Sequence, residues 1–247
     1  MRYVLIAAAL AASPACAQTD RLILVGDSTL ATKSGYGDAL CARFDGPCLN
    51  LARGGRSSMS FRAEGRWDEV LRLLAEPGAP RSHVLIQFGH NDQPGKPGRS
   101  TDLVREFPAN LARYVEETRA AGGVPVLLTP LTRRSFRGPW LHDDLAPWAA
   151  ATRRVAAAQG ALLLDLHRLS SAAVQAMGET AADTLAMASR PQPGQPIHPA
   201  TTAERAGAAH PVFDRTHLGE PGARLFSSMV ARELQRLAPE LGPRLHP

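Results

Sequence analysis

The sequence predicts a three-layer α/β/α domain with a parallel sheet of about five strands. Short apolar runs alternate along the chain with longer segments in which apolar side chains recur every three or four residues. Such alternation of strands with helices is typical of a parallel sheet that helices cover on both faces. The length of 247 residues suits one domain, and no internal repeat or long low-complexity linker divides the chain.

Residues 1–17 are predicted to be a secretory signal peptide, which leaves a single domain over residues 18–247. Arg2 precedes an apolar run, and Ala15-Cys16-Ala17 supplies the small residues of a cleavage site. The apolar run is too short to span a membrane comfortably. Lipid attachment at Cys16 is the alternative, but the large aliphatic residue expected at the start of such a site is missing. We therefore expect a secreted or periplasmic protein.

The first predicted strand, residues 22–25, leads into Gly26-Asp27-Ser28-Thr29. Gly26 permits a tight backbone, and Ser28 should lie at or near the first residue of the next helix, where backbone N–H groups favour negative charge. Ser28 is thus a candidate nucleophile, provided that the chain also supplies a base, an acid and oxyanion donors. The alternative is ordinary turn chemistry, with Asp27 and Ser28 as helix N-caps. The segment lacks the Gly-x-Ser-x-Gly elbow of the α/β-hydrolases, which argues against that fold.

A helix over residues 35–43 and a short strand over 48–51 are expected next. Once the signal peptide is removed, Cys41 and Cys48 are the cysteines that remain. In an exported chain, two cysteines around a turn predict a disulfide, which would contribute on the order of 2–3 kcal/mol on the chain-entropy model. Two free buried thiols are the alternative.

The loop that leaves this strand contains Gly54-Gly55, where the backbone can approach a ligand closely and offer its N–H groups. A flexible turn is the alternative interpretation. A helix over residues 63–75 follows, with apolar side chains on one face, and Glu76-Pro77-Gly78 ends it.

The strand over residues 84–88 is apolar except for Gln87 and delivers Gly89-His90-Asn91-Asp92 at its carboxyl end. Ligands of open α/β sheets bind at that edge. The Asn91 side chain can donate an N–H to an oxyanion, although a turn asparagine that caps its own backbone is the alternative. Residues 93–100, rich in proline and glycine, should form part of the rim of the site.

The second half of the chain continues the alternation. Its predicted elements are a helix over 102–121, a strand over 124–129, a helix over 145–159, a strand over 161–164 and a helix over 166–177. Arg133 and Arg134 follow the fourth strand and suit substrate carboxylates, or are simply solvated. Residues 179–210 are weakly patterned and are interpreted as a long excursion with uncertain helices. Asp214 and His217 then precede a helix over 220–237, so that one turn can place the carboxylate against the ring; a helix cap is the alternative.

The chain has a formal net charge of +5, carried almost entirely by arginine. A basic exported protein without basic runs or stacked aromatic residues suits an acidic partner, such as a polyanionic polysaccharide, better than nucleic acid. An arginine-rich composition of the source organism explains the charge equally well. The sequence leaves the oligomeric state open.

Together these residues supply what a serine hydrolase needs, namely a nucleophile, a base, an orienting carboxylate and oxyanion donors. Ser28, His217 and Asp214 would fill the first three roles. The backbone N–H groups of Ser28 and Gly55 and the side chain of Asn91 would form the oxyanion hole.

Four blocks in this order resemble the SGNH (GDSL-like) hydrolase superfamily, which is named for its Ser, Gly, Asn and His. The matching residues are Ser28 in Gly-Asp-Ser-Thr, Gly55 in Gly-Gly-Arg-Ser, Asn91 in Gly-His-Asn-Asp and His217 in Asp-Arg-Thr-His. Four ordered blocks that span essentially the whole mature chain are much more specific than any one of them.

Within the superfamily, the chain looks most like the rhamnogalacturonan acetylesterases, which deacetylate pectin. The likeness rests on residues 55–57 with 64–67, on 88–93, and on 128–130 with the arginine pair close behind. It implies a flavodoxin-like fold, no metal or other cofactor, and a shallow cleft for acidic sugar chains. The residues expected to contact substrate are Arg56, His90, Arg133 and Arg134. Residues 218–220 depart from the pattern of the family, and residues 179–210 match nothing in it.

The resemblance implies an exported serine esterase that removes O-acetyl groups from an acidic plant polysaccharide through an acyl-enzyme. An esterase for acetylated xylan or for short-chain esters is the close alternative, and no apolar lid for long acyl chains is visible. A non-catalytic carbohydrate-binding protein on the same fold is an alternative of another class. Metal-dependent hydrolysis is a third and weaker alternative, because the histidines lack the spacing of metal ligands.

Overall fold

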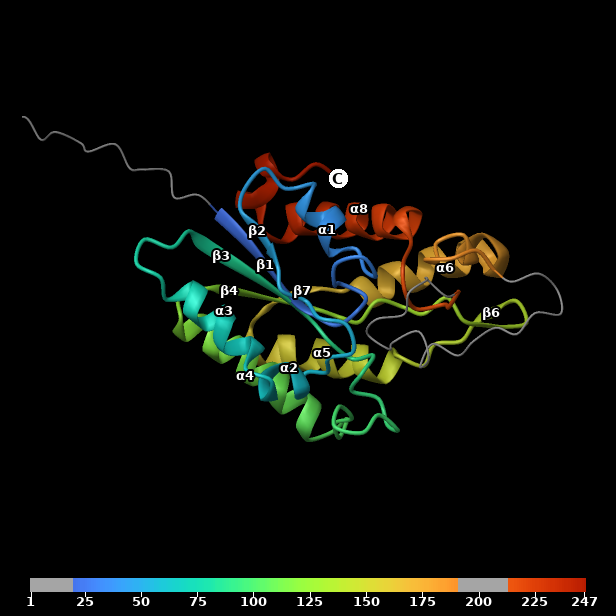
Figure 1. Cartoon of the computed structure of the whole chain (residues 1–247), viewed down its shortest axis with the longest axis horizontal. Coiled ribbons are helices and arrows are strands. Elements are labelled where there is room, and N and C mark those ends of the chain that lie inside the picture. Colours follow the sequence, from blue (N-terminus) through green and yellow to red (C-terminus); the bar gives the residue numbers. More distant parts are fainter. Residues whose placement is uncertain (1–19, 191–212) are drawn as a thin grey trace, which may run out of the picture.

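Five parallel strands form the sheet at the centre of the molecule (Figure 1). The computed structural model describes residues 20–190 and 213–247, so the predicted signal peptide, Cys16 and most of the predicted excursion lie outside the described residues. The strands are β1 (Asp20–Gly26), β2 (Cys48–Asn50), β3 (Arg81–Gln87), β4 (Val124–Leu128) and β7 (Leu162–Leu164), in the order β2-β1-β3-β4-β7. The predicted parallel sheet of about five strands is confirmed.

Helices cover both faces of this sheet, and α1, α6 and α8 lie on the face opposite to α2–α5 (Figure 1). The first layer consists of α1 (Gly37–Cys41), α6 (Leu166–Asp183) and α8 (Glu220–Leu237). The second consists of α2 (Ser60–Ala63), α3 (Arg66–Leu74), α4 (Glu106–Ala120) and α5 (Ala146–Gln159). A 3₁₀ helix, η1 (Pro239–Arg244), follows α8.

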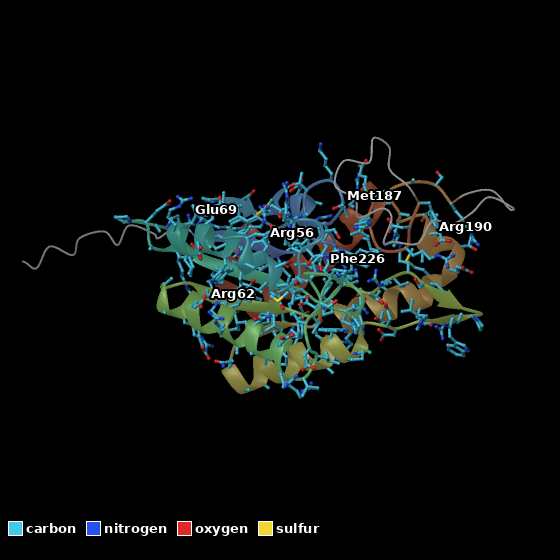
Figure 2. All side chains as sticks on the ribbon, turned by 60° about the horizontal axis from the view of Figure 1, so that its bottom comes forward. Arg56, Arg62, Glu69, Met187, Arg190 and Phe226 are labelled. Atoms are coloured by element: carbon cyan, nitrogen blue, oxygen red, sulfur yellow. A yellow bond between two sulfur atoms is a disulfide. The ribbon has the colours of Figure 1, made fainter. Side chains whose placement is uncertain are left out.

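The strands alternate their side chains between two hydrophobic clusters, as a period of two residues requires. Leu22 and Leu24 of β1 belong to the cluster that also holds Phe226 of α8, whereas Ile23 and Val25 belong to the cluster on the other face. Figure 2 labels Phe226 among the side chains that fill the interior. Because β1 is buried on both faces, its residues 22–25 are continuously apolar rather than alternating.

Several boundaries differ from the prediction for local reasons. The helix predicted over 63–75 is α3, which starts only at Arg66, because Gly65 adopts a left-handed backbone with φ +73° and separates it from the short helix α2 before it. Helix α4 begins at Glu106 rather than at residue 102, and a turn precedes it in which the Asp102 carboxylate accepts the N–H groups of Val104 and Arg105. Helix α1 is shorter than predicted.

Two features of the second half were not predicted. Strands β5 (Phe136–Arg137) and β6 (Trp140–Leu141) form a small antiparallel hairpin. Helix α6 continues to Asp183, beyond residue 177, with a non-helical backbone at Gly178. The predicted excursion therefore starts later than residue 179.

The predicted disulfide between Cys41 and Cys48 is confirmed. It joins the last residue of α1 to the first residue of β2, at the amino ends of the strands.

The order of the strands reverses between β1 and β3. From β1 the chain builds β2 on one side, then crosses back to β3 and continues outward to β4 and β7. In open parallel sheets, ligands bind beyond the carboxyl ends of the strands at such a switch point. Ser28 follows β1 and Asn91 follows β3, so the topology brings both residues to this place. No helix within the described ranges is long and apolar enough to cross a membrane.

Candidate active site

Ser28 lies in a turn that directly follows β1. The N–H groups of Leu30 and Ala31 both donate to the Asp27 carbonyl, at 3.2 and 3.0 Å, and this single turn is not continued. Helix α1 begins only at Gly37, so the prediction that Ser28 starts a helix is wrong. A turn holds the serine at the edge of the sheet equally well, and Ser28 is 4% exposed.

Ser28, His217 and Asp214 form one hydrogen-bonded chain. The Nε2 atom of His217 lies 2.8 Å from the Ser28 hydroxyl oxygen, and its Nδ1 lies 2.8 Å from the Asp214 carboxylate. An ionised carboxylate accepts hydrogen bonds, so it places the imidazole proton on Nδ1 and leaves Nε2 free to accept the serine proton. The structure thus brings together three side chains that sequence analysis singled out.

The Asp214 carboxylate is fixed from two sides. Its other oxygen accepts the main-chain N–H groups of Thr216 and His217, both at 2.7 Å. Burial raises the pKa of Asp214, but hydrogen bonding and charge attraction from His217 outweigh burial, and the pKa is lowered overall. The carboxylate is therefore ionised at neutral pH and suited to stabilise an imidazolium.

The glycine loop lies against the end of β1. The Arg53 N–H donates to the Gly26 carbonyl at 2.9 Å, and a Cβ added to Gly54 would lie 3.6 Å from the Cβ of Ser28. Gly55 has φ +78°, a conformation that favours glycine. The loop that carries Gly55 is thus held beside the nucleophile, as an oxyanion donor requires.

The buried Asn91 side chain joins the glycine loop to the edge of β3. Its Nδ2 donates to the Arg56 carbonyl at 3.1 Å, and its Oδ1 accepts a hydrogen bond from Lys96 at 3.3 Å. One amide hydrogen is used in this way, which leaves the second for an oxyanion. The alternative that Asn91 caps its own backbone is not what the structure shows.

Arg56 is the one member of the predicted substrate-contacting set whose side chain remains substantially exposed. Its guanidinium bonds to Glu64 and to the Gly54 carbonyl, and 26% of its side chain is accessible. Arg56 is labelled in Figure 2. It stays a candidate for contact with substrate.

Arg133 and Arg134 are neither solvated nor free. The Arg133 guanidinium bonds to Gln93, Asp144 and Thr216 and is 12% exposed. The Arg134 side chain is fully buried and bonds to main-chain carbonyls. The predicted substrate contact of Arg134 is therefore corrected, because its guanidinium is buried and bonds only within the described protein.

His90 is also buried rather than at the surface. Its Nδ1 faces a carboxylate oxygen of Asp27 at 3.3 Å, and its Nε2 has no hydrogen-bond partner among the described residues. Burial lowers the pKa of His90, so the ring is neutral at neutral pH. The predicted contact of His90 with substrate is therefore corrected, because the ring is buried beside Asp27, the residue before Ser28.

Sequence reasoning missed a buried polar chain beneath Ser28. Tyr36 donates to Gln87 at 2.5 Å, Gln87 donates to Thr29 at 2.7 Å, and Thr29 donates to Asp27 at 2.8 Å. The signal was Gln87, the single polar residue of an apolar strand. The chain fixes both neighbours of Ser28 in the sequence.

A second buried acid, Asp92, fastens the loop after β2 to the loop after β3. It accepts the N–H and hydroxyl of Ser58, at 3.0 and 2.5 Å, and the hydroxyl of Thr101 at 3.1 Å. Burial nevertheless raises the pKa of Asp92 to about 7. Asp92 is adjacent to Asn91, so these bonds also position the oxyanion donor.

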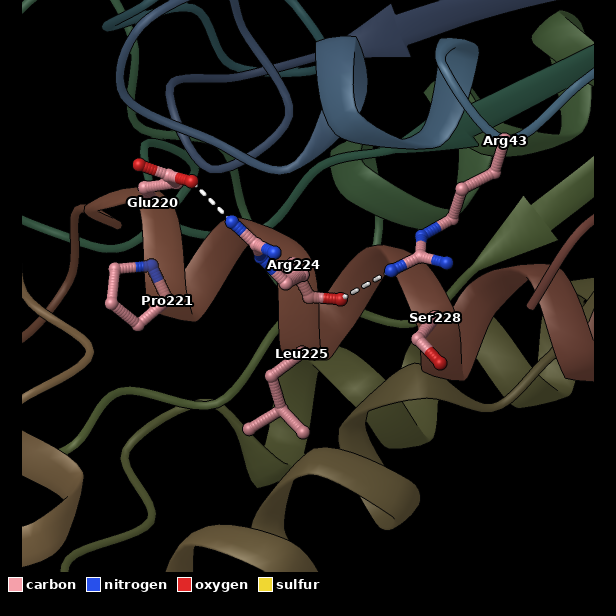
Figure 3. Close-up of a pocket in the computed structure, with 6 residues that line it drawn as sticks. All are labelled: Arg43, Glu220, Pro221, Arg224, Leu225 and Ser228. Carbon is pink, nitrogen blue, oxygen red and sulfur yellow. Dashed lines mark hydrogen bonds and ion pairs between the residues drawn. The ribbon is translucent and has the colours of Figure 1, made fainter.

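Two cavities lie beside α8. The one in Figure 3, of about 610 Å³, is lined by Arg43, Glu220, Pro221, Arg224, Leu225 and Ser228, and includes none of the predicted site residues. The other, of about 290 Å³, includes Lys33, Met187 and Leu218. Neither cavity is lined by Ser28, Asp214 or His217. Residues 20–190 and 213–247 contain no group of three or more His, Cys, Asp or Glu that could hold a metal ion.

Comparison with known proteins finds a matching family model and two relatives that are named as acetylesterases. Residues 23–225 match the model of the GDSL-like Lipase/Acylhydrolase family. The probable rhamnogalacturonan acetylesterase YesY of Bacillus subtilis (strain 168) is 27% identical over 227 residues, 88% of this chain and 94% of that protein. The rhamnogalacturonan acetylesterase RhgT of the same organism is 29% identical over 227 residues, 88% of this chain and 90% of that protein.

Solved structures share the fold. Protein YXIM_BACsu from Bacillus subtilis superposes with a TM-score of 0.68 at 24% identity, over 88% of this chain and 57% of its own. A mutant of Axe2, an acetyl-xylooligosaccharide esterase from Geobacillus Stearmophilus, gives a TM-score of 0.59 at 18% identity, over 88% of this chain and 93% of its own.

Proposed function

We propose that this chain, which belongs to the GDSL-like lipase/acylhydrolase family, removes O-acetyl groups from an acidic polysaccharide of the rhamnogalacturonan type. Membership of the family makes it a carboxylic ester hydrolase. The observation that carries the proposal is the chain of two 2.8 Å contacts from Ser28 through His217 to Asp214 at the switch point of the sheet.

The first half of the reaction forms an acetyl-enzyme. The Ser28 oxygen attacks the acetyl carbonyl while His217 Nε2 accepts the hydroxyl proton, and Asp214 stabilises the resulting imidazolium. The N–H groups of Ser28 and Gly55 and the Asn91 side chain stabilise the oxyanion, each by about 3 kcal/mol of barrier. The tetrahedral intermediate then collapses, the bond to the sugar oxygen breaks, and His217 returns the proton to that oxygen.

The second half repeats these steps with water. His217 removes a proton from water as the water oxygen attacks the acetyl carbon, and the same donors stabilise the second tetrahedral intermediate. Its collapse releases acetate and returns the proton to Ser28.

Three observations support an acidic sugar polymer as the substrate. Both Bacillus relatives bear the name rhamnogalacturonan acetylesterase, the net charge is +5, and the partly exposed Arg56, which is ion-paired with Glu64, lies on the glycine loop. An exported enzyme, secreted or periplasmic, suits a polymer that does not enter the cell. Fractionation of cells that express the full chain tests export, and accumulation in the cytoplasm would contradict it.

The proposal is tested by acetate release from acetylated rhamnogalacturonan, homogalacturonan and xylan, with the Ser28→Ala variant as the catalytic control. We expect rhamnogalacturonan to be the best substrate and Ser28→Ala to release almost no acetate. Xylan is included because Axe2, which shares the fold, is named for acetylated xylo-oligosaccharides. Preference for xylan would reassign the substrate, and a fully active Ser28→Ala variant would refute the mechanism.

A further inference from the structure

One residue satisfies every main-chain carbonyl of the segment that carries the acid and the base. We name residues 214–217 the acid–base loop. The Arg134 guanidinium donates to the carbonyls of Asp214 at 3.1 Å, Thr216 at 3.3 Å and His217 at 2.8 Å. The Arg134 main-chain N–H donates to the remaining carbonyl, that of Arg215, at 2.8 Å.

We propose that Arg134 is a positioning residue of the esterase, which holds the acid–base loop in the register that lets His217 reach Ser28. The inference rests on the proposed roles of Asp214 and His217. Arg134 touches neither the reacting atoms nor solvent, since its side chain is fully buried. It acts by fixing the backbone from which the imidazole and the carboxylate project.

The other hydrogen bonds of the loop leave its carbonyls unused. Arg133 donates to the Thr216 hydroxyl, and the Arg215 guanidinium donates to Asp183 and Glu179. Leu218 anchors the far end by donating to the Ser34 carbonyl at 2.9 Å, and the Asp214 carboxylate accepts N–H groups within the loop. None of these hydrogen bonds engages a carbonyl of residues 214–217. A planar guanidinium, with five donors in a rigid fork, bonds to several carbonyls at once, whereas a lysine ammonium lacks that geometry.

Burial of the Arg134 charge costs folding free energy, and a role in positioning the acid–base loop explains why the charge is buried there. The Nε atom of Arg134 is buried and has no hydrogen-bond partner among the described residues. Burial lowers the pKa of Arg134 to about 10, so the group remains charged at neutral pH. A buried charge is weak evidence of a gain in stability. Here every hydrogen bond that the guanidinium makes in the described structure ends on the acid–base loop.

The test compares Arg134→Met and Arg134→Lys with a matched control, Arg21→Met. Arg21 is also a buried arginine, 6% exposed, and bonds to Ser82 and to the Leu73 carbonyl at the opposite, amino end of the sheet. For each variant, circular dichroism establishes folding, and kcat and KM are measured with p-nitrophenyl acetate. Proton NMR then records the low-field resonance of the hydrogen-bonded imidazole N–H.

We expect folded Arg134→Met to lose about 100-fold in kcat with KM changed less than about threefold, because small displacements of catalytic groups have costs of this size. Its low-field resonance should broaden or vanish, and Arg134→Lys should lose about tenfold in kcat. Arg21→Met should unfold at a lower temperature but keep its kcat and its low-field resonance.

A folded Arg134→Met variant with wild-type kcat and resonance would overturn the inference. If that variant does not fold, wild-type kcat in Arg134→Lys would overturn it too, and failure of both to fold would assign Arg134 to folding instead. His217→Ala separates this inference from the proposed function. Full activity of His217→Ala refutes the proposed mechanism, whereas an inactive His217→Ala beside a fully active Arg134→Met refutes only the role of Arg134.

Discussion

At the scale of single residues, reactivity arises from contacts between residues that lie far apart in the sequence. Ser28 and His217 lie 2.8 Å apart, although 189 positions separate them in the chain. The motifs identified the triad and oxyanion candidates because each role demands a particular residue type. They misjudged His90 and Arg134, because a position at a strand end does not reveal whether a side chain points to solvent or to the interior.

Replacement of Asn91 by alanine tests the oxyanion hole. We expect kcat with p-nitrophenyl acetate to fall by about 10²–10³-fold, since one donor to the transition state is lost. Gln235→Ala is the control, because Gln235 is also a part-buried amide side chain and donates to the Gly242 and Leu245 carbonyls near the C-terminus rather than toward Ser28. Equal kcat values for the two variants would remove Asn91 from the mechanism.

The buried acid Asp92 should make stability depend on pH. Its pKa is about 7 in the folded protein and about 3.9 in the unfolded chain, so between these values the unfolded chain has already released the proton. This group therefore lowers the free energy of unfolding as pH rises from about 4 to about 7, by at most about 4 kcal/mol.

Asp92→Asn removes that titration and offers the measurement. Urea unfolding of wild type and variant should show that the stability of the wild type relative to the variant declines between about pH 4 and pH 7 and is constant above. A difference that stays flat over the whole range would show that Asp92 does not titrate there.

At the scale of elements, short apolar runs predicted each strand of the sheet, and local chemistry set the ends of the helices. The break at Gly65 and the late start of α4 involve residues visible in the sequence, namely a glycine and an aspartate that bonds to the main chain of the turn before α4. The β5–β6 hairpin was missed because two-residue strands carry no periodicity. Its pairing depends on tertiary structure, including the Gln175 side chain of α6, which bonds to Leu141.

The disulfide is an element-level restraint without a part in the chemistry. The double variant Cys41→Ser with Cys48→Ser should lose on the order of 2–3 kcal/mol of unfolding free energy in urea, because its unfolded chain is less restricted. Its kcat should be unchanged, since the disulfide joins the amino end of β2 to α1, away from the carboxyl edge where Ser28 lies. Unaltered stability, or a large loss of kcat, would contradict this separation of roles.

At the scale of the whole molecule, topology gathers the site. Alternating strands and helices predicted the parallel sheet, and the reversal between β1 and β3 places Ser28 and Asn91 at one edge. The substrate rim could not be derived in the same way, because side chains from several segments build it and the sequence does not show which of them face solvent.

The charge of the whole molecule leads to a prediction about salt. If the basic protein attracts an acidic polymer, KM for acetylated rhamnogalacturonan should rise with sodium chloride, because salt screens exposed charges beyond about 10 Å at 0.1 M. KM for neutral p-nitrophenyl acetate should not change. The same salt dependence for both substrates would show that net charge plays no part in recognition.

The identity of the nucleophile is tested most directly by labelling with a fluorophosphonate, followed by peptide mass spectrometry. We predict one adduct, on Ser28, formed rapidly by the wild type and far more slowly by His217→Ala, because the imidazole must accept the hydroxyl proton. An active wild type that carries the label on another residue, or that takes up none, would contradict a mechanism based on Ser28.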